Sequence, residues 1–306
     1  MELRRLQHFL AVVDHGGFSA AADEVTVSQP GLSQSVKQLE HELGVGLFER
    51  IGRRVQLTPA GVALVGPARQ VLRDVETGRA AVAAVAGAEA GSLALASLPT
   101  LAADPLAGLV GRFRRLHPGV VVDLAAPEDT TDLVAMVRDG RCEMGVTEAA
   151  DLPDDLVARS IGEQALVLVV PPGFEVPDGT RSTVVDPPGR VRTLALSELV
   201  DVPFVAAPVG TSTRRLLDQG FAAVGAMPQV AVVTAQRDAI LPLVVAGAGA
   251  ALVPAPSATV AEAWGAQVIR PDPAIVRGVA VVHRAGPLAP AAARFLDLAA
   301  GGILRP

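Results

Sequence analysis

Apolar residues near the N-terminus restrict the fold of this chain more than any other feature. They recur at helical spacing in three short runs, which predicts helices over about residues 3–14, 18–25 and 29–43. Gly16 and Gly44 follow the first and third runs, and glycine commonly ends helices. Two short helices joined by a tight turn are typical of a helix-turn-helix unit.

The third predicted helix has an apolar face and a polar face. Ser28 is a good N-cap, and Pro30 falls in the first turn, where its missing N–H costs nothing. The outward positions carry amides, hydroxyls and one cation, with no carboxylate before Glu40. Such side chains form hydrogen bonds with base edges and phosphates. Taken alone, the same pattern also fits a solvated polar face.

Residues 47–57 predict a β-hairpin with arginines at its tip, which would form a wing beside the helices. From Arg50 to Arg73 the chain has five arginines and no acidic residue, although its net charge is -6. The average composition therefore gives no sign of a polyanionic partner, while the positive charge that such a partner needs is concentrated locally.

These segments strongly resemble the winged helix-turn-helix of LysR-type transcriptional regulators. The matching motifs occur in family order: Phe9-Leu10-Ala11-Val12, Gly17-Phe18-Ser19-Ala20-Ala21-Ala22, Val27-Ser28-Gln29-Pro30, Leu32-Ser33, Gln38-Leu39-Glu40, Leu43-Gly44-Val45, Leu47-Phe48-Glu49-Arg50 and Leu57-Thr58-Pro59-Ala60-Gly61. The resemblance implies a sequence-specific regulator whose partner is double-stranded DNA.

The resemblance also indicates which residues contact DNA, in the major groove and at the wing. The predicted contacts are Ser28, Gln29, Pro30, Ser33, Gln34, Lys37, Arg50, Arg53 and Arg54. One departure matters, because the family often has arginine where this chain has Gln34. A guanine or phosphate contact would then be missing, and we expect a different operator preference.

Thr58-Pro59 is a favoured start for a helix, and roughly 28 residues of regular pattern follow it. Apolar and small residues at alternating spacings of four and three predict that this helix pairs with a second copy of itself. Packing against its own domain is the alternative. The resemblance implies an antiparallel dimer and favours a tetramer built from dimers. The predicted dimer contacts are Leu64, Ala68, Val71, Val75 and Val82.

Residues 91–306 alternate short apolar runs with helical patterns, which predicts largely parallel sheets covered by helices. The segment is long enough for two lobes, with crossings expected near 160–170 and 264–270. It resembles the family's two-lobed, periplasmic-binding-protein-like (type 2) effector domain. The matching motifs are Phe113-Arg114-Arg115-Leu116-His117-Pro118-Gly119 and Val245-Ala246-Gly247-Ala248-Gly249-Ala250-Ala251-Leu252.

The predicted fold class is therefore α/β with an all-α-rich N-terminal part. The expected divisions are a winged helix-turn-helix domain at 1–58, a linker helix and hinge at 59–90, and an effector domain at 91–306. Within the effector domain we expect lobe I at about 91–162 and 268–306, and lobe II at about 163–267.

Ligands of open α/β lobes bind where strand ends meet helix N-termini. Several loops of this kind present hydroxyls beside free N–H groups, which suits a carboxylate, although helix capping alone would explain each one. The candidate effector-binding residues are Ser97, Pro99, Thr100, Leu101, Thr147, Thr211, Ser212, Thr213 and Gln236. The resemblance implies that the positions of Thr100 and Thr211 line the cleft between the lobes.

The sequence lacks the residues that several kinds of catalytic and metal-binding site require. Lys37, the single lysine, has no P-loop setting, Cys142 is the only cysteine, and His41-Glu42 lacks a second metal ligand because Val45 stands there. We expect no cofactor, no metal and no enzymatic activity, and we interpret Cys142 as a packing residue. The N-terminus has no signal-peptide pattern, so we expect a cytoplasmic protein with no membrane partner.

The leading interpretation is a DNA-binding regulator switched by a small, carboxylate-bearing effector. If it activates transcription, RNA polymerase is a further partner. Three alternatives remain: a regulator with a vestigial effector cleft, an exported solute-binding receptor, and a small-molecule enzyme on an α/β scaffold.

Overall fold

The computed structural model describes residues 1–51, 54–85, 91–175 and 192–301. Its N-terminal elements are α1 (Leu3–His15), α2 (Phe18–Glu24), α3 (Gln29–Leu43), β1 (Phe48–Ile51) and β2 (Arg54–Leu57). The three predicted helices and the hairpin are thereby confirmed. Gly16 and Gly44 end their helices with φ of 69° and 70°, a left-handed conformation that costs glycine little.

The hairpin is attached to the end of α3 by Glu40. Its carboxylate accepts hydrogen bonds from the backbone N–H groups of Leu47 at 2.7 Å and Phe48 at 3.2 Å. The Phe48 ring then packs against Phe9 and Phe18, with ring centroids 5.4 and 5.5 Å apart. The wing is therefore positioned by the same core that holds the helices.

The long helix α4 (Pro59–Val85) begins within the helix-turn-helix domain. Gly61 lies so close to the hairpin that a Cβ atom there would be 2.2 Å from the carbonyl oxygen of Leu47. Ala68 is 1% exposed and, with Leu64, belongs to the apolar core formed by α1 and α3. Both residues were predicted to lie in a dimer seam. Ala68 is instead buried in the core of its own chain, and half-buried Leu64, which packs against that core, stays a prediction.

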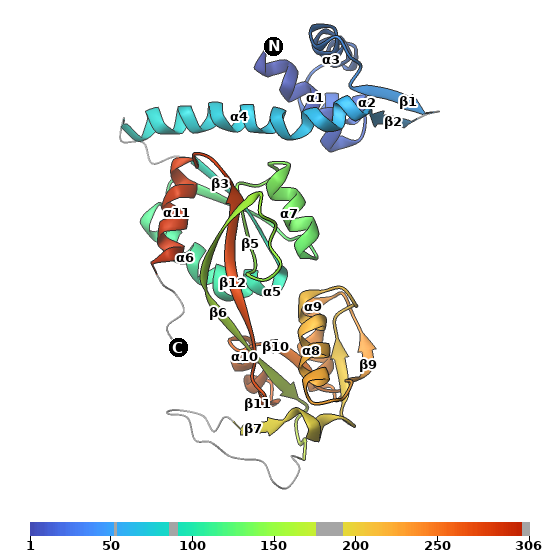
Figure 1. The fold of residues 1–306 in the computed structure, drawn as a ribbon, viewed down its shortest axis with the longest axis vertical. Helices are drawn as coiled ribbons and strands as arrows, with labels where there is room; N and C mark the ends of the chain where they lie inside the picture. Colours follow the sequence, from blue (N-terminus) through green and yellow to red (C-terminus); the bar gives the residue numbers. More distant parts are fainter. Residues whose placement is uncertain (52–53, 86–90, 176–191, 302–306) are drawn as a thin grey trace.

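The second half of α4 is different. Val71 is exposed, Val75 is half-buried and Val82 is 71% exposed. These three residues remain candidates for contact with a second copy. In Figure 1, α4 lies as a rod between the helix-turn-helix domain and the rest of the chain.

Lobe I contains a parallel arrangement of β4, β3 and β5, extended by antiparallel strands β12 and β6. Its elements are β3 (Gly91–Ser97), α5 (Pro99–Leu101), the π-helical turn η1 (Ala102–Leu106), α6 (Ala107–Leu116), β4 (Val120–Ala125), α7 (Thr130–Arg138), β5 (Met144–Glu148) and α11 (Pro290–Ala300). One apolar core lies between these strands and helices.

Lobe II is the lower part of Figure 1. Its elements are β7 (Arg192–Ala195), the 3-10 turn η2 (Leu196–Leu199), β8 (Pro203–Ala206), α8 (Ser212–Ala223), β9 (Gln229–Val233), α9 (Arg237–Val245), β10 (Ala251–Pro254), α10 (Ser257–Ala263) and β11 (Gln267–Asp272). Two apolar clusters fill it, on opposite faces of its strands.

Two long antiparallel strands, β6 (Leu156–Val170) and β12 (Ile275–Arg284), run through both lobes (Figure 1). The first crossing falls where the sequence predicted it. The second crossing was expected near 264–270. This prediction is wrong, because these residues lead into β11, which pairs with β6 and β7 inside lobe II. The prediction of largely parallel sheets is also corrected, because the crossing strands β6 and β12 are antiparallel.

Across the described ranges, the helices are too short or too polar to cross a membrane.

Candidate functional site

The polar face of α3 is open to solvent. Gln29, Gln34 and Lys37 are exposed and Ser33 is half-buried. Exposed Pro30 lies in the first turn. Ser28 has a structural role as well, because its hydroxyl accepts a hydrogen bond from the N–H of Gly31 at 3.3 Å and so caps the helix. This face is therefore open to contact with another molecule.

Two of the predicted wing contacts, Arg50 and Arg54, lie in the last two pairs of the β1–β2 ladder. Arg50 pairs with Val55 and Ile51 with Arg54 along the β1–β2 ladder, so the backbone turns back where the sequence indicated. Arg53 lies outside the described residues, as do the side chains of Arg50 and Arg54.

The boundary between the two lobes is built around Arg277, a β12 residue that the sequence analysis missed. Its guanidinium, 3% exposed, donates hydrogen bonds to the hydroxyls of Thr100 and Ser212, each at 2.5 Å. It also donates to Gln164 Oε1 through Nε at 2.8 Å. These partners come from α5, α8 and β6, so one side chain ties both lobes to a crossing strand.

Glu148, the last residue of β5, neutralises this arginine. Its buried carboxylate lies 3.3 Å from Arg277 and also accepts hydrogen bonds from Ser212 and Arg215. Burial and the nearby charge of Arg215 lower the pKa of Arg277 to about 10, so the guanidinium is still charged at neutral pH. Thr100 and Ser212 were predicted to bind an anion. Ser212 donates to the protein's own carboxylate, and Thr100 accepts from Arg277.

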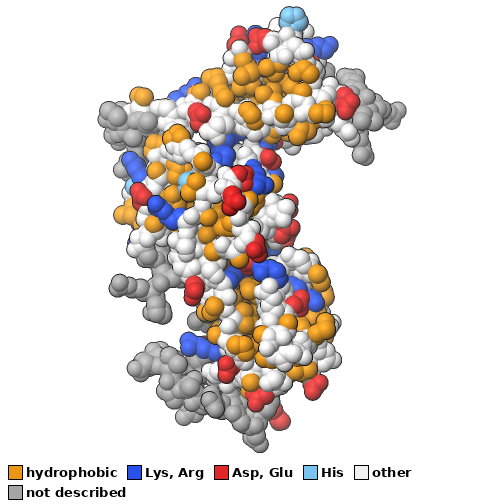
Figure 2. Space-filling view, in the orientation of Figure 1, with side chains coloured by type: hydrophobic (Ala, Val, Ile, Leu, Met, Phe, Trp, Pro, Cys, Tyr) orange, Lys and Arg blue, Asp and Glu red, His pale blue; other side chains and the backbone are white. Residues whose placement is uncertain are grey.

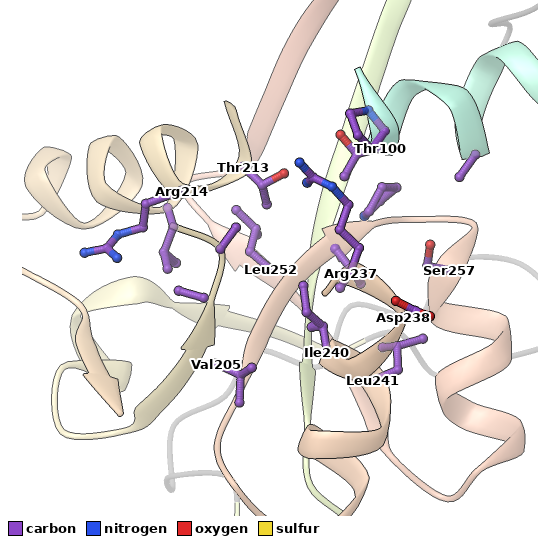
Figure 3. A pocket seen from close by; sticks show the side chains of 17 residues that line it. Thr100, Val205, Thr213, Arg214, Arg237, Asp238, Ile240, Leu241, Leu252 and Ser257 are labelled. Carbon is purple, nitrogen blue, oxygen red and sulfur yellow. The ribbon is translucent and has the colours of Figure 1, made fainter. Parts of the chain in front are cut away.

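Beside this cluster lies a cavity of about 260 Å³ (Figure 3). Three of the candidate effector-binding residues line it: Pro99 and Thr100 from lobe I and Thr213 from lobe II. Most of its wall is apolar and comes from lobe II, including Val205 and Ile240. The cavity therefore opens at the lobe boundary and extends into lobe II.

Two polar groups at the mouth of this cavity stand out. The hydroxyl of Thr213 is buried without a hydrogen-bond partner in the described part of the chain. Arg237, at the start of α9, lines the cavity and forms an ion pair with Glu128 of lobe I at 3.1 Å. Basic and acidic side chains meet along the lobe boundary in Figure 2.

Other predicted effector residues do not line the cavity. Leu101 packs in the core of lobe I. Buried Ser97 donates to the carbonyl of Leu98 at 3.0 Å, and Thr211 donates to the carbonyl of Pro208 at 2.8 Å. These hydroxyls stabilise their own loops.

The remaining two candidates are equally local. Buried Thr147 hydrogen-bonds the hydroxyl of Thr130 at 3.2 Å. The backbone N–H of Gln236 donates to the hydroxyl of Thr234 at 3.0 Å. Charged or amide residues inside apolar strands, such as Gln164 and Arg277, were the better signal for the site, because such groups are buried only when paired.

A second polar cluster joins α4 to lobe I. Arg73 donates to the carbonyl of Gly140 and, at 2.8 Å, to the side-chain oxygen of Gln70. Arg284, near the end of β12, donates to the same Gln70 oxygen at 3.1 Å and to the carbonyls of Val137 and Cys142. Thus β12 carries one arginine at the lobe boundary and another at the linker helix.

Cys142 is buried in the lobe I core. Burial raises the pKa of its thiol to about 11, which disfavours the reactive thiolate. Among the described residues, no three histidine, cysteine or carboxylate side chains are grouped as metal ligands would be.

The fold and these sites define a class: a helix-turn-helix protein with a long linker helix and a two-lobed ligand-binding domain. Residues 3–62 match the bacterial regulatory helix-turn-helix protein, lysR family, and residues 86–302 match the LysR substrate binding domain. The chain belongs to the LysR family of transcriptional regulators.

Similar proteins support the assignment over the whole chain. The HTH-type transcriptional regulator TfdS of Cupriavidus pinatubonensis is 29% identical over 305 residues, 99% of each chain. TfdT of the same organism is 30% identical over 210 residues, which cover 69% of this chain and 86% of TfdT. These relatives are regulators, and nothing in their names describes an enzyme.

Solved structures agree. Full-length CbnR complexed with its target DNA is 25% identical, with a TM-score of 0.64 over 98% of this chain and 99% of CbnR. A full-length OxyR variant of Pseudomonas aeruginosa has a TM-score of 0.71 at 23% identity, over 98% of this chain and 94% of OxyR, and shows the shared fold.

Proposed function

We propose that this LysR-family regulator recognises its operator through the polar face of α3 and the wing, and that a small anionic effector, such as a carboxylate, switches it by binding between the lobes. The observation that carries the proposal is the cavity at the lobe boundary, which Thr100 of lobe I and Arg237 of lobe II both line. A cavity lined from both lobes suits a ligand whose binding depends on how the lobes are placed.

DNA recognition is supported by the exposed amides and cation of α3 and by the likeness to CbnR, whose structure contains target DNA. Gln29 and Gln34 are suited to adenine, and Lys37 to guanine or phosphate. We assign Arg53 to phosphate contact at the wing.

The exposed apolar residues of α4 support a proposal for how copies of the protein assemble. Exposed Val71 and Val82, with half-buried Val75, give the helix an apolar stripe that a second copy would cover. Two recognition helices about 34 Å apart would then read half-sites one helical turn apart. We propose a dimer that assembles into a tetramer in the cytoplasm, where its DNA lies, and RNA polymerase as a partner if the protein is an activator.

Switching is a linkage between ligand and DNA. An effector that favours one lobe geometry biases every element whose position depends on that geometry. Strand β12 is the element we assign this role, because Arg277 lies at the lobe boundary and Arg284 contacts Gln70 of the linker helix.

A footprint on the DNA upstream of the protein's own coding region, repeated with a panel of small carboxylates, tests the proposal. We expect protection of two half-sites and a change in the protected length with at least one carboxylate. A footprint that no ligand alters would favour a vestigial cleft.

Two substitutions separate the kinds of DNA contact. Arg53→Ala is expected to weaken binding to all sequences and to flatten its salt dependence, as loss of a phosphate contact does. Gln29→Ala is expected to cost about 1 to 3 kcal/mol at particular base pairs. Equal losses on operator and random DNA for Gln29→Ala would contradict base reading.

A further inference from the structure

The buried arginine at the lobe boundary is not open to a ligand. Arg277 and Glu148 are 3% and 6% exposed at their side chains, and each has several hydrogen bonds to the residues around it. A ligand anion that replaced Glu148 would leave that carboxylate buried and without its partner, which is strongly unfavourable. The cluster around Arg277 therefore holds the lobes together, and an effector must find its anion site elsewhere.

Arg237 has the opposite character. Its partner Glu128 is 66% exposed, and such exposed ion pairs contribute little stability. When a ligand anion takes the place of Glu128, the released carboxylate is hydrated at once. Figure 3 shows the guanidinium of Arg237 directed toward the side of the cavity lined by Thr100 and Thr213. Arg237 is therefore a cation that a ligand in this cavity can reach.

Thr213 supplies a second, independent indication of a ligand. The residue is 9% exposed, lines the cavity, and its hydroxyl has no partner among the residues described. Buried hydroxyls are almost always hydrogen-bonded, and an unsatisfied one is costly. A ligand oxygen held by Arg237 would accept the missing hydrogen bond.

The rest of the cavity sets the chemistry of the ligand's body. Its deeper wall is formed by apolar side chains: Val205, Leu217, Ile240, Leu241 and Leu252. Arg214 at the edge is already paired with Asp218 at 2.9 Å, and Asp238 adds a negative charge to the lining. A second anionic group on the ligand would meet Asp238 and lose its hydration. An apolar cavity of about 150 Å³ holds a benzene molecule, so 260 Å³ accommodates a ring or short chain with one head group.

We propose that the effector is a compact amphiphile with one carboxylate, whose head group binds Arg237 and Thr213 in exchange for Glu128 and whose apolar body fills the lobe II cavity. This inference rests on the proposed function and narrows it to a ligand class. Dicarboxylates and fully polar anions are excluded by the same lining.

Calorimetric titration of the full-length protein tests the ligand class. The probes are a series of cyclic and linear monocarboxylates with six to ten carbons, including cyclohexanecarboxylate and octanoate, beside their neutral amides and the dicarboxylate adipate. We expect at least one monocarboxylate to bind, its amide to bind at least ~10-fold more weakly, and adipate to give no heat of binding. Binding of adipate or of the amide alone overturns the inference, and so does a series in which no monocarboxylate binds.

Variants titrated with a monocarboxylate that binds the wild-type protein test the residues assigned to the site. Arg237→Gln is expected to weaken binding at least ~10-fold, as loss of a charge-assisted hydrogen bond does. Glu128→Gln is expected to tighten it ~2- to 5-fold, because it removes an internal competitor whose pairing is weak. The matched control Glu198→Gln, an exposed carboxylate outside the cavity lining, should change nothing. Weaker binding by Glu128→Gln contradicts the exchange.

Thr213→Val separates a ligand contact from a structural role. The shape is kept and the unsatisfied hydroxyl is removed, so the unliganded protein should melt at a higher temperature while the monocarboxylate binds ~5-fold more weakly. A variant that is less stable and binds normally overturns the assignment of Thr213.

The footprint experiment distinguishes failure of this inference from failure of the proposed function. If adipate or a neutral compound alters the protected length, the regulator is effector-switched and only the ligand class is wrong. If a monocarboxylate binds in the calorimeter and no compound alters the footprint, the cavity inference stands and the switching proposal fails.

Discussion

Neutralising Glu148 is the sharpest test of how the two lobes are held together. Glu148→Gln keeps the size and shape of the side chain and removes its charge. Arg277 then stays buried with neutral acceptors only: Thr100, Gln164 and Ser212. Arg215, the other cation on Glu148, is 44% exposed and turns to solvent at little cost.

The expected cost follows from the burial of the pair. Removing one partner of a buried ion pair costs about 3 to 5 kcal/mol. Glutamine still accepts a hydrogen bond, so we expect about 3 kcal/mol, the lower end of that range. For a domain of this size the melting temperature should fall by roughly 6 to 12 °C, at about 2 to 4 °C per kcal/mol.

Trp264, the single tryptophan, follows α10 in lobe II and reports the unfolding of that lobe in urea. Glu198→Gln is the control, since Glu198 is exposed on the same lobe. The double variant Glu148→Gln/Arg277→Met should cost less than the sum of the two single variants, because it leaves no buried charge without its partner. A cost below about 1 kcal/mol for Glu148→Gln, or strict additivity, would refute the reasoning.

Three further predictions concern other parts of the chain. Gly61→Ala should destabilise the DNA-binding domain by about 1 to 3 kcal/mol in thermal unfolding, because the new Cβ meets the carbonyl of Leu47 at 2.2 Å; unchanged stability would show that α4 and the hairpin separate easily. The Cys142 thiol should react with a disulfide reagent at pH 8 roughly 100-fold more slowly in the native than in the urea-unfolded protein, because its pKa rises to about 11; equal rates would place the thiol at the surface. Burial raises the pKa of Glu143, so the native state holds this proton to higher pH than the unfolded chain, and stability falls as pH rises above the ordinary value. Glu143→Gln should therefore be more stable than wild type at pH 7, with the advantage shrinking toward pH 4 in melting curves; an advantage that does not depend on pH would count against burial as the cause.

Local patterns were sufficient for the three N-terminal helices, the hairpin and the start of the linker helix. The runs ending at Gly16 and Gly44, the cap at Ser28 and the start at Thr58-Pro59 each involve neighbours within one or two turns. Such signals depend on the chain nearby, so they can be read without the tertiary structure. The exposed polar face of α3 was predicted in the same way, because its period is that of a single helix.

The same reasoning failed where one pattern fits two partners. Spacings of four and three along α4 describe an apolar stripe, and a stripe does not say what covers it. The structure buries Ala68 in the chain's own core, with Leu64 packed against it, and leaves Val71 and Val82 outside it. The choice depends on where α1 and α3 come to lie, which is a tertiary fact.

The amino-acid sequence by itself determined the class of this protein: its helix-turn-helix unit, its linker helix and its α/β effector domain. Only the tertiary structure decided the chemistry of the cleft. Arg277 meets Glu148 across 129 positions of sequence and Gln164 across 113, and no local pattern encodes such a pairing. Ser212, predicted to bind an anion, donates to the protein's own Glu148 instead, because two antiparallel strands bring Glu148 and Arg277 together and burial requires that these charges be paired.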